Sequence, residues 1–453
     1  MRVAIVCLLL VLWAPLAAEP LDAVVEELYD GGAQVTCPSG LVYSVTGYDS
    51  VTRNRVRWEG DLTAGHLRGM PEGGFNRLTI EYSSDRDLRM NIVYMEEDSP
   101  VRGEYYLAKN DRSFSFLTEG WSAGRLSSRI LSVTLRPLSG EASAVIRGFT
   151  PSVAPAADTD TCYLENKYLR AGIRLLWGGG VNLLEDKRCP VEGLGNLINM
   201  ADTGRLIQQS YYMDSAGPDF KAGTSFGQQW CYNPVQGGDQ FGNHSRLIDF
   251  EKRGDSLYVK AQPLDWALDG FVTPSYVENV YTLRDRALVV DNTFTDFSGM
   301  EQSVHSQEVP AFYTVSYLGR FVYYGGSRPW TGDAVTERES LPFWGGDYPA
   351  ECKFGFDPSN TERWSAWMCP DKDYGIGLFT PGAASLIAGR HAWNGSKDPL
   401  DGATNYTAPL ITAAIKSGKP LKYRYVITTG GIGEIRGLFA KYRGQGAGFA
   451  GYR

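Results

Sequence analysis

Hydrophobic and polar residues alternate in short runs along the first third of the chain. Such runs cover residues 78–82, 88–92, 114–116 and 131–135, and clusters of glycine, proline, serine and aspartate separate them. A period of two is typical of strands that bury one face, and short strands at this spacing favour a compact sandwich. The pattern therefore predicts an N-terminal β-sandwich.

Residues 151–161 interrupt the alternation with a proline- and alanine-rich polar stretch that has no apolar period, which is typical of a linker. Alternation then resumes. Strands are predicted over residues 169–177, 257–261, 276–283, 287–294, 374–379 and 421–427, with short helices at 21–29 and 435–442. We expect an all-β protein in which an N-terminal, jelly-roll-like β-sandwich (residues 19–150) precedes a larger β-supersandwich, the catalytic domain (residues 162–453).

The first eighteen residues have the composition of a secretory signal peptide. Arg2 precedes an apolar run that is too short to span a bilayer, and small residues follow before Glu19. We expect cleavage after Ala18 and a secreted protein, extracellular or periplasmic, without a membrane anchor.

Charge and cysteine content narrow the function further. The formal net charge is -8 and there is no tract rich in lysine or arginine, which argues against a nucleic-acid partner. Six cysteines follow the leader, too few for a disulfide scaffold in a chain of this length, and no CxxC pair occurs. No metal site and no cofactor are predicted.

The first chemistry-bearing segment covers residues 202–212 and combines charged, amide and phenol groups. If the segment is extended, Arg205, Gln209 and Tyr211 share one face, while Gln208 shares the other face with its apolar and serine neighbours. Amides and guanidinium groups match sugar hydroxyls or a uronate carboxylate, although Arg205 could equally form a structural ion pair with Asp202.

A second segment, residues 230–244, has the turn signals of a loop and is rich in aromatic residues. Exposed rings could stack on sugar faces, and the alternative is an Ω-loop packed by its own aromatics. The candidate substrate-binding residues here are Trp230, Asn233, Gln236 and Asp239.

The best catalytic candidates lie in residues 305–313. Glu308 could protonate a glycosidic oxygen, with Asp202 as the second carboxylate that glycoside cleavage normally uses. A proline two residues after Glu308 is expected to end the strand or to force a bulge that re-aims its neighbours. His305 is a further catalytic candidate, and Gln307 and Tyr313 are candidates for substrate binding.

Two alternatives remain open at this point. The same residues allow β-elimination on a uronate, with Tyr313 or His305 as base and Arg205 neutralising the sugar carboxylate. A buried His and Glu that are satisfied by the backbone would leave a noncatalytic glycan-binding protein.

Residues 169–186, with an aromatic strand end and the glycines 178–180, resemble the opening of galactose-mutarotase-like supersandwich domains, and 364–379 resemble a later hairpin of that class. Residues 202–211 and 305–313 are similar to strings in secreted carbohydrate-active proteins, and 56–150 look like a jelly-roll accessory module. The resemblance implies fold and a sugar substrate only. It transfers no catalytic role, because mutarotases take their His acid and Glu base from well separated strands, whereas His305 and Glu308 are closely spaced.

The sequence thus favours a secreted enzyme that hydrolyses glycosidic bonds in a polysaccharide or oligosaccharide. A uronate lyase and a noncatalytic glycan binder are the alternatives.

Overall fold

The computed structural model describes residues 71–140, 142–155, 160–338, 341, 360–383 and 385–444, and the backbone of four further strands, β1 (Val24–Glu27), β2 (Ala33–Thr36), β3 (Val42–Val45) and β4 (Arg55–Trp58). The predicted leader and the middle of the predicted linker lie outside the described residues. None of the helices that the structure describes is long and apolar enough to cross a membrane.

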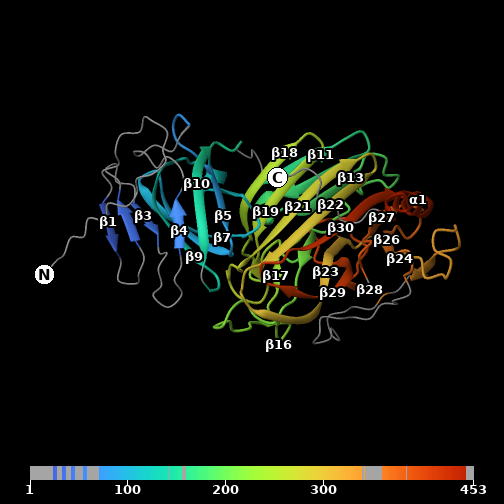
Figure 1. Ribbon diagram of the computed structural model, residues 1–453. Helices are drawn as coiled ribbons and strands as arrows, with labels where there is room; N and C mark the ends of the chain where they lie inside the picture. Colours follow the sequence, from blue (N-terminus) through green and yellow to red (C-terminus); the bar gives the residue numbers. More distant parts are fainter. Residues whose placement is uncertain are drawn as a thin grey trace.

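Two small sheets, antiparallel except for one strand pair, form the N-terminal sandwich (Figure 1). One has the order β4-β10-β5-β8 and the other β7-β6-β9; β10 and β4 form the one parallel pair among these described strands. Alternate residues of both sheets face a shared apolar core that includes Ile80, Tyr82, Met90 and Phe116. The strands are β5 (Arg77–Ser84), β6 (Leu88–Glu96), β7 (Ser99–Leu107), β8 (Ser113–Leu117), β9 (Ser127–Pro137) and β10 (Ser143–Ser152).

The larger part of the chain forms two nine-stranded sheets that enclose the main core. The first sheet has the order β11-β12-β13-β14-β23-β29-β28, and β17 and β20 extend it beside β14. Its strands are β11 (Thr161–Glu165), β12 (Leu169–Arg174), β13 (Gly180–Asp186), β14 (Ile207–Ser210), β17 (Pro234–Val235), β20 (Leu264–Asp265), β23 (Glu301–Val315), β28 (Ser385–His391) and β29 (Thr404–Lys416).

The second sheet has the order β18-β19-β21-β22-β30-β27-β26-β24-β25. Core residues such as Ile207 and Phe312 come from the first sheet and Tyr281, Val290 and Ile427 from the second. Its strands are β18 (Arg246–Arg253), β19 (Ser256–Gln262), β21 (Ser275–Arg284), β22 (Ala287–Asp296), β24 (Arg320–Tyr323), β25 (Thr336–Arg338), β26 (Trp364–Met368), β27 (Gly375–Phe379) and β30 (Leu421–Gly430).

The sandwich and the larger part meet where β8 lies against β18, and β5 and β7 add further contacts. Arg77 Nε donates to Asp249 Oδ1 at 2.8 Å, and Tyr276 Oη accepts the backbone N–H of Tyr106 at 2.7 Å. The Tyr106 ring also stacks on Phe297 at 5.5 Å between centroids. Because these contacts join apolar and charged groups across the junction, the two parts pack directly against each other.

The all-β prediction, with a sandwich followed by a larger two-sheet domain, is confirmed. The terminal helix is also present, as α1 (Ile432–Tyr442), and packs Ile435 and Phe439 onto the second sheet. The helix predicted over 21–29 is wrong, because Val24–Glu27 form strand β1, paired with β2. The adjacent pair Val24-Val25 is β-branched and favours a strand over a helix.

Candidate functional site

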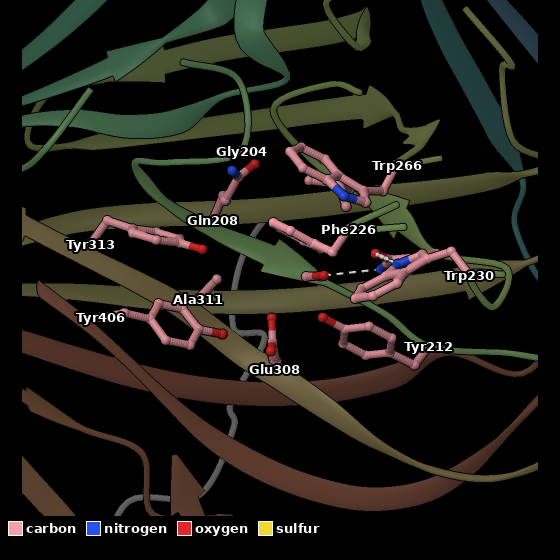
Figure 2. A pocket seen from close by; sticks show the side chains of 13 residues that line it. Gly204, Gln208, Tyr212, Phe226, Trp230, Trp266, Glu308, Ala311, Tyr313 and Tyr406 are labelled. Carbon is pink, nitrogen blue, oxygen red and sulfur yellow. Dashed lines mark hydrogen bonds between the residues drawn. The ribbon is translucent and has the colours of Figure 1, made fainter. Parts of the chain in front are cut away.

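A pocket with an empty volume of about 530 Å³, including its open mouth, lies against β14 and β23 of the first sheet (Figure 2). Six of the thirteen lining residues are aromatic and one is a carboxylate. The lining residues are Gly204, Gln208, Ser210, Tyr212, Phe226, Trp230, Asn233, Val235, Trp266, Glu308, Ala311, Tyr313 and Tyr406.

Strand alternation decides which residues of the 202–212 segment reach the pocket. Gln208, Ser210 and Tyr212 line it, whereas Gln209 and Tyr211 point into the core between the sheets. The Gln209 amide donates to Asn279 at 2.8 Å, and the Tyr211 ring stacks on Phe294 at 3.8 Å. From the sequence, residues on both faces of this segment were predicted to bind substrate. In the structure only the face with Gln208 lines the pocket, and Tyr212 lines it as well.

A bulge in β23 brings part of the segment 305–313 to the same pocket. The pairing of β23 with β29 shifts register between Glu308 and Phe312, and the pairing of β14 with β23 shifts at the same level. The extra residue reverses the alternation of the side chains. Glu308 and Tyr313 therefore face the same side of β23, together with Ala311, although an odd number of positions separates them. The bulge expected at the proline is present and does re-aim its neighbours.

Asn233 fixes the loop wall of the pocket. Its side-chain oxygen accepts the Trp230 indole N–H at 3.0 Å, and its amide nitrogen donates to Ser210 Oγ at 3.0 Å and to the Tyr211 carbonyl at 2.7 Å. Figure 2 shows this link between the indole and the strand. These three partners all belong to the protein itself, so Asn233 acts by holding Trp230 in place.

Besides Tyr212, three aromatic wall residues were not predicted from the sequence. Trp266 donates its indole N–H to Ser225 Oγ at 2.9 Å, Tyr406 comes from β29 with its ring 4.6 Å from that of Tyr313, and Phe226 lies at the mouth. For Trp266 a signal existed, because a tryptophan within the polar turn 265–270 is out of keeping with a plain loop. Tyr406 carries no local signal, since it reaches the pocket through strand pairing.

Glu308 is the one carboxylic acid among the residues that line the pocket. It is 4% exposed, and among the thirteen lining residues none is lysine, arginine or histidine. Burial raises the pKa of the Tyr313 phenol, and the negative charges of Glu308 and then of Asp202 raise it further, while Arg205 opposes them. Tyr313 therefore lies within electrostatic reach of both predicted carboxylates.

Asp202 and Arg205 lie at the rim and do not line the pocket. Asp202 is exposed, accepts the backbone N–H of Gly204 at 3.0 Å, and lies 3.5 Å from Arg205 Nε. The Arg205 guanidinium also lies 3.5 Å from Asn199 Oδ1 and 3.3 Å from the Asp401 carbonyl. Because Gly204 is a lining residue, the Asp202 carboxylate lies immediately beside the pocket.

His305 lies elsewhere. Its Nε2 contacts Asp214 at 2.8 Å and Ser303 Oγ at 3.1 Å, on the partly exposed early part of β23. Gln307 pairs with the backbone of Tyr212, accepting its N–H at 2.7 Å and donating to its carbonyl at 3.0 Å. In place of a sugar contact, Gln307 therefore positions a residue that lines the pocket.

The remaining predicted amides and acids have internal partners. The Gln208 amide donates to the carbonyls of Thr203 and Arg205, and that of Gln236 donates to the Gly178 carbonyl. Asp239 accepts the backbone N–H groups of residues 241, 243 and 270. These groups stabilise the loops around the pocket. Within the described ranges, no group of three histidines, cysteines or acids could hold a metal ion.

Asp265 gives the loops beside the pocket a pH-dependent stability. It is fully buried and accepts the backbone N–H groups of Asn233 and Ala267, yet burial raises its pKa from 3.8 to about 6. Between about pH 4 and pH 6 the folded state thus holds a proton that the unfolded state has lost, so stability falls as pH rises through this window.

We expect Asp265→Asn to reduce that fall by about 1–3 kcal/mol, measured by urea unfolding at closely spaced pH values. The exposed Asp269 of the same loop provides the control, since Asp269→Asn should leave the pH profile unchanged. An unaltered profile for Asp265→Asn would contradict the assignment.

No protein-family model and no curated protein matches the chain. Solved structures with a similar arrangement include the Slr1438 protein of Synechocystis sp. PCC 6803, with 11% identity, 62% of this chain and 100% of that chain covered, and a TM-score of 0.36. A galactose mutarotase related enzyme of Lactobacillus acidophilus has 10% identity, coverage of 59% and 97%, and a TM-score of 0.36. The GH36 alpha-galactosidase AgaB of Geobacillus stearothermophilus has 10% identity, coverage of 63% and 42%, and a TM-score of 0.35.

The structures similar to this chain thus include galactose mutarotase-like proteins and carbohydrate-active enzymes. At such TM-scores the likenesses carry no argument about activity, and the case for function rests on the residues of the pocket.

Proposed function

We propose that the pocket binds a sugar ring of a non-acidic glycan, and that the protein is a secreted enzyme that hydrolyses glycosidic bonds. The observation that carries the proposal is Glu308, a buried carboxylate within a pocket walled by six aromatic rings. The C–H faces of a pyranose are apolar and pack on aromatic rings, while phenol and hydroxyl groups such as those of Tyr212, Tyr406 and Ser210 can bond to sugar hydroxyls. The apolar leader of residues 1–18 supports export.

In this mechanism Glu308 donates a proton to the glycosidic oxygen as the bond to the anomeric carbon breaks. Asp202, beside the pocket at Gly204, is the second carboxylate, acting either as base toward water or as nucleophile. The electron-rich faces of the surrounding rings favour the positive charge that develops on the sugar. Tyr313 lies within electrostatic reach of both carboxylates and can position the sugar between them.

Elimination on a uronate fits the pocket less well. It would place a sugar carboxylate in a lining that contains the acid Glu308 and, among its thirteen residues, no lysine, arginine or histidine. Of the three residues predicted to carry out elimination, Tyr313 lines the pocket, whereas Arg205 is paired with Asp202 and His305 with Asp214.

The lack of a cationic side chain among the lining residues yields a test with matched glycans. We expect the protein to release new reducing ends from neutral oligosaccharides, whereas polygalacturonate should give neither reducing ends nor an ultraviolet-absorbing unsaturated product. The physical reason is that the thirteen lining residues include no lysine, arginine or histidine to pair with a uronate carboxylate in this poorly solvated site. The measurement compares cello-, manno-, xylo- and N-acetylchito-oligosaccharides with oligogalacturonates of equal length.

An unsaturated product from the uronates would overturn the hydrolysis proposal. Retention of a neutral glycan without any product would overturn catalysis and leave a binding protein.

A further inference from the structure

A hairpin at the mouth of the pocket has an unusual residue at its tip. Strands β15 (Thr224–Ser225) and β16 (Gln228–Gln229) pair around the two-residue loop Phe226-Gly227. Both loop residues have positive φ, 49° for Phe226 and 73° for Gly227, as in a type I′ turn. Asparagine or glycine is preferred at the first of these positions, because a bulky side chain is strained in the left-handed region.

The Phe226 side chain gains little from folding. It is 66% exposed, so most of its apolar surface remains in water. Its ring lines the pocket and lies 5.7 Å from that of Trp230. Figure 2 shows the Phe226 and Trp230 rings along the same side of the pocket, above Glu308. A strained backbone and an exposed ring both disfavour phenylalanine here on grounds of stability alone.

The hairpin is nevertheless held firmly. Ser225 Oγ accepts the Trp266 indole N–H at 2.9 Å and donates to Gln240 Oε1 at 2.9 Å, and Gln240 Nε2 donates to the Thr224 carbonyl at 2.7 Å. These bonds join the hairpin to two neighbouring loops. These hydrogen bonds therefore hold the hairpin, and with it the Phe226 ring, at the mouth of the pocket.

We propose that Phe226 is the stacking platform for a second sugar unit, so that the glycan bound in the pocket is an oligosaccharide chain that leaves through this mouth. This inference rests on the proposed function, because it takes the pocket to hold a sugar ring. It adds chain-length specificity: the ring held among Trp230, Trp266 and Glu308 is followed by one packed on Phe226. Hydrophobic contact with a ring that is already ordered gives affinity at low entropic cost.

The test is the variant Phe226→Asn, with Phe241→Asn as its control. Asparagine suits the positive φ of the turn, so the melting temperature should stay the same or rise. Phe241 is also exposed, on the adjacent loop tied through Gln240, but it does not line the pocket. Calorimetric titrations with the mono- to tetrasaccharides of the cello, manno, xylo and N-acetylchito series would measure affinity as a function of chain length.

In the wild-type protein we expect affinity to rise from the monosaccharide to the disaccharide or trisaccharide of the bound series. Phe226→Asn should weaken the longer ligands about tenfold and the monosaccharide less than about twofold, as for the loss of one buried anchor. Phe241→Asn should change neither.

Equal loss for all chain lengths, or no loss, would overturn the role of Phe226 while leaving a sugar pocket in place. A wild-type affinity that is independent of chain length would do the same. If no series binds to the wild-type protein, the proposed function fails and this inference fails with it.

Discussion

We expect replacement of Glu308 by glutamine to lower the proposed rate of glycan cleavage by about 10²–10⁴-fold and to leave the fold intact. A glutamine amide has the shape of the carboxyl group but donates no proton to a leaving oxygen, and general acid catalysis contributes an effect of this size. Glu308 is 4% exposed, among aromatic rings that exclude water, so no solvent acid replaces it easily. Steady-state kinetics on the best neutral oligosaccharide, with circular dichroism for the fold, measure both expectations.

Glu96 provides a matched control, since it is also a glutamate with 4% exposure. It lies in the N-terminal sandwich, where it accepts the backbone N–H of Gly120 at 2.7 Å and lies 3.4 Å from Arg125. Glu96→Gln should keep the wild-type rate even if it loses some stability. Full activity in Glu308→Gln would remove Glu308 from the chemistry and with it the hydrolytic mechanism.

The sequence predicted the class of fold because its signal is local. Successive side chains of a strand point to opposite faces, so a strand with one buried face has apolar residues at every second position. Leu88, Met90 and Ile92 follow this pattern, and their side chains do fill the sandwich core. The C-terminal helix was found for the same reason. Near the N-terminus a helix was predicted over residues 21–29, whereas pairing with β2 makes Val24–Glu27 a strand.

The candidate site was predicted as two strings that meet, and Gln208, Glu308 and Tyr313 do line one pocket. The choice of face was the weak step. Nothing local shows that Gln209 and Tyr211 face the core and Gln208 faces the pocket, because both faces of β14 carry polar groups. His305 was also grouped with Glu308 by sequence distance, whereas in the structure it pairs with Asp214.

The aromatic wall needed the three-dimensional structure. Tyr406 reaches the pocket from β29 because that strand pairs with β23, and Trp266 and Phe226 arrive on loops that hydrogen bonds join to each other. Residues that converge through long-range pairing leave no pattern within a short window of sequence. The bulge after Glu308 did have a local signal, because a proline within a strand predicts either the end of the strand or a bulge.

The second large effect concerns stability, at the pair that joins α1 to the second sheet. Arg436 of the helix donates to both carboxylate oxygens of Glu362, at 2.6 and 2.9 Å. Glu362 is 1% exposed and also accepts the Trp364 indole N–H at 2.6 Å. The guanidinium lies 4.6 Å from the centre of the Tyr324 ring.

Arg436→Leu should lower the free energy of unfolding by about 3–5 kcal/mol, because it leaves the Glu362 carboxylate buried without its cation. The exposed pair of Arg328 and Asp333 gives the control: the Arg328 side chain is 72% exposed, so Arg328→Leu should cost less than about 1 kcal/mol. Urea denaturation of each variant measures the difference.

The double variant Glu362→Leu/Arg436→Leu separates the buried charge from the helix contact itself. If the loss in Arg436→Leu comes from the unpaired carboxylate, removing both charges restores much of the stability, since an apolar pair of similar volume is often as stable as a buried ion pair. Equal losses in the single and double variants would instead mean that the arginine acts through its packing on Tyr324 and its hydrogen bond to the Asp333 carbonyl. In that case the charge of Glu362 would contribute nothing to the attachment of α1.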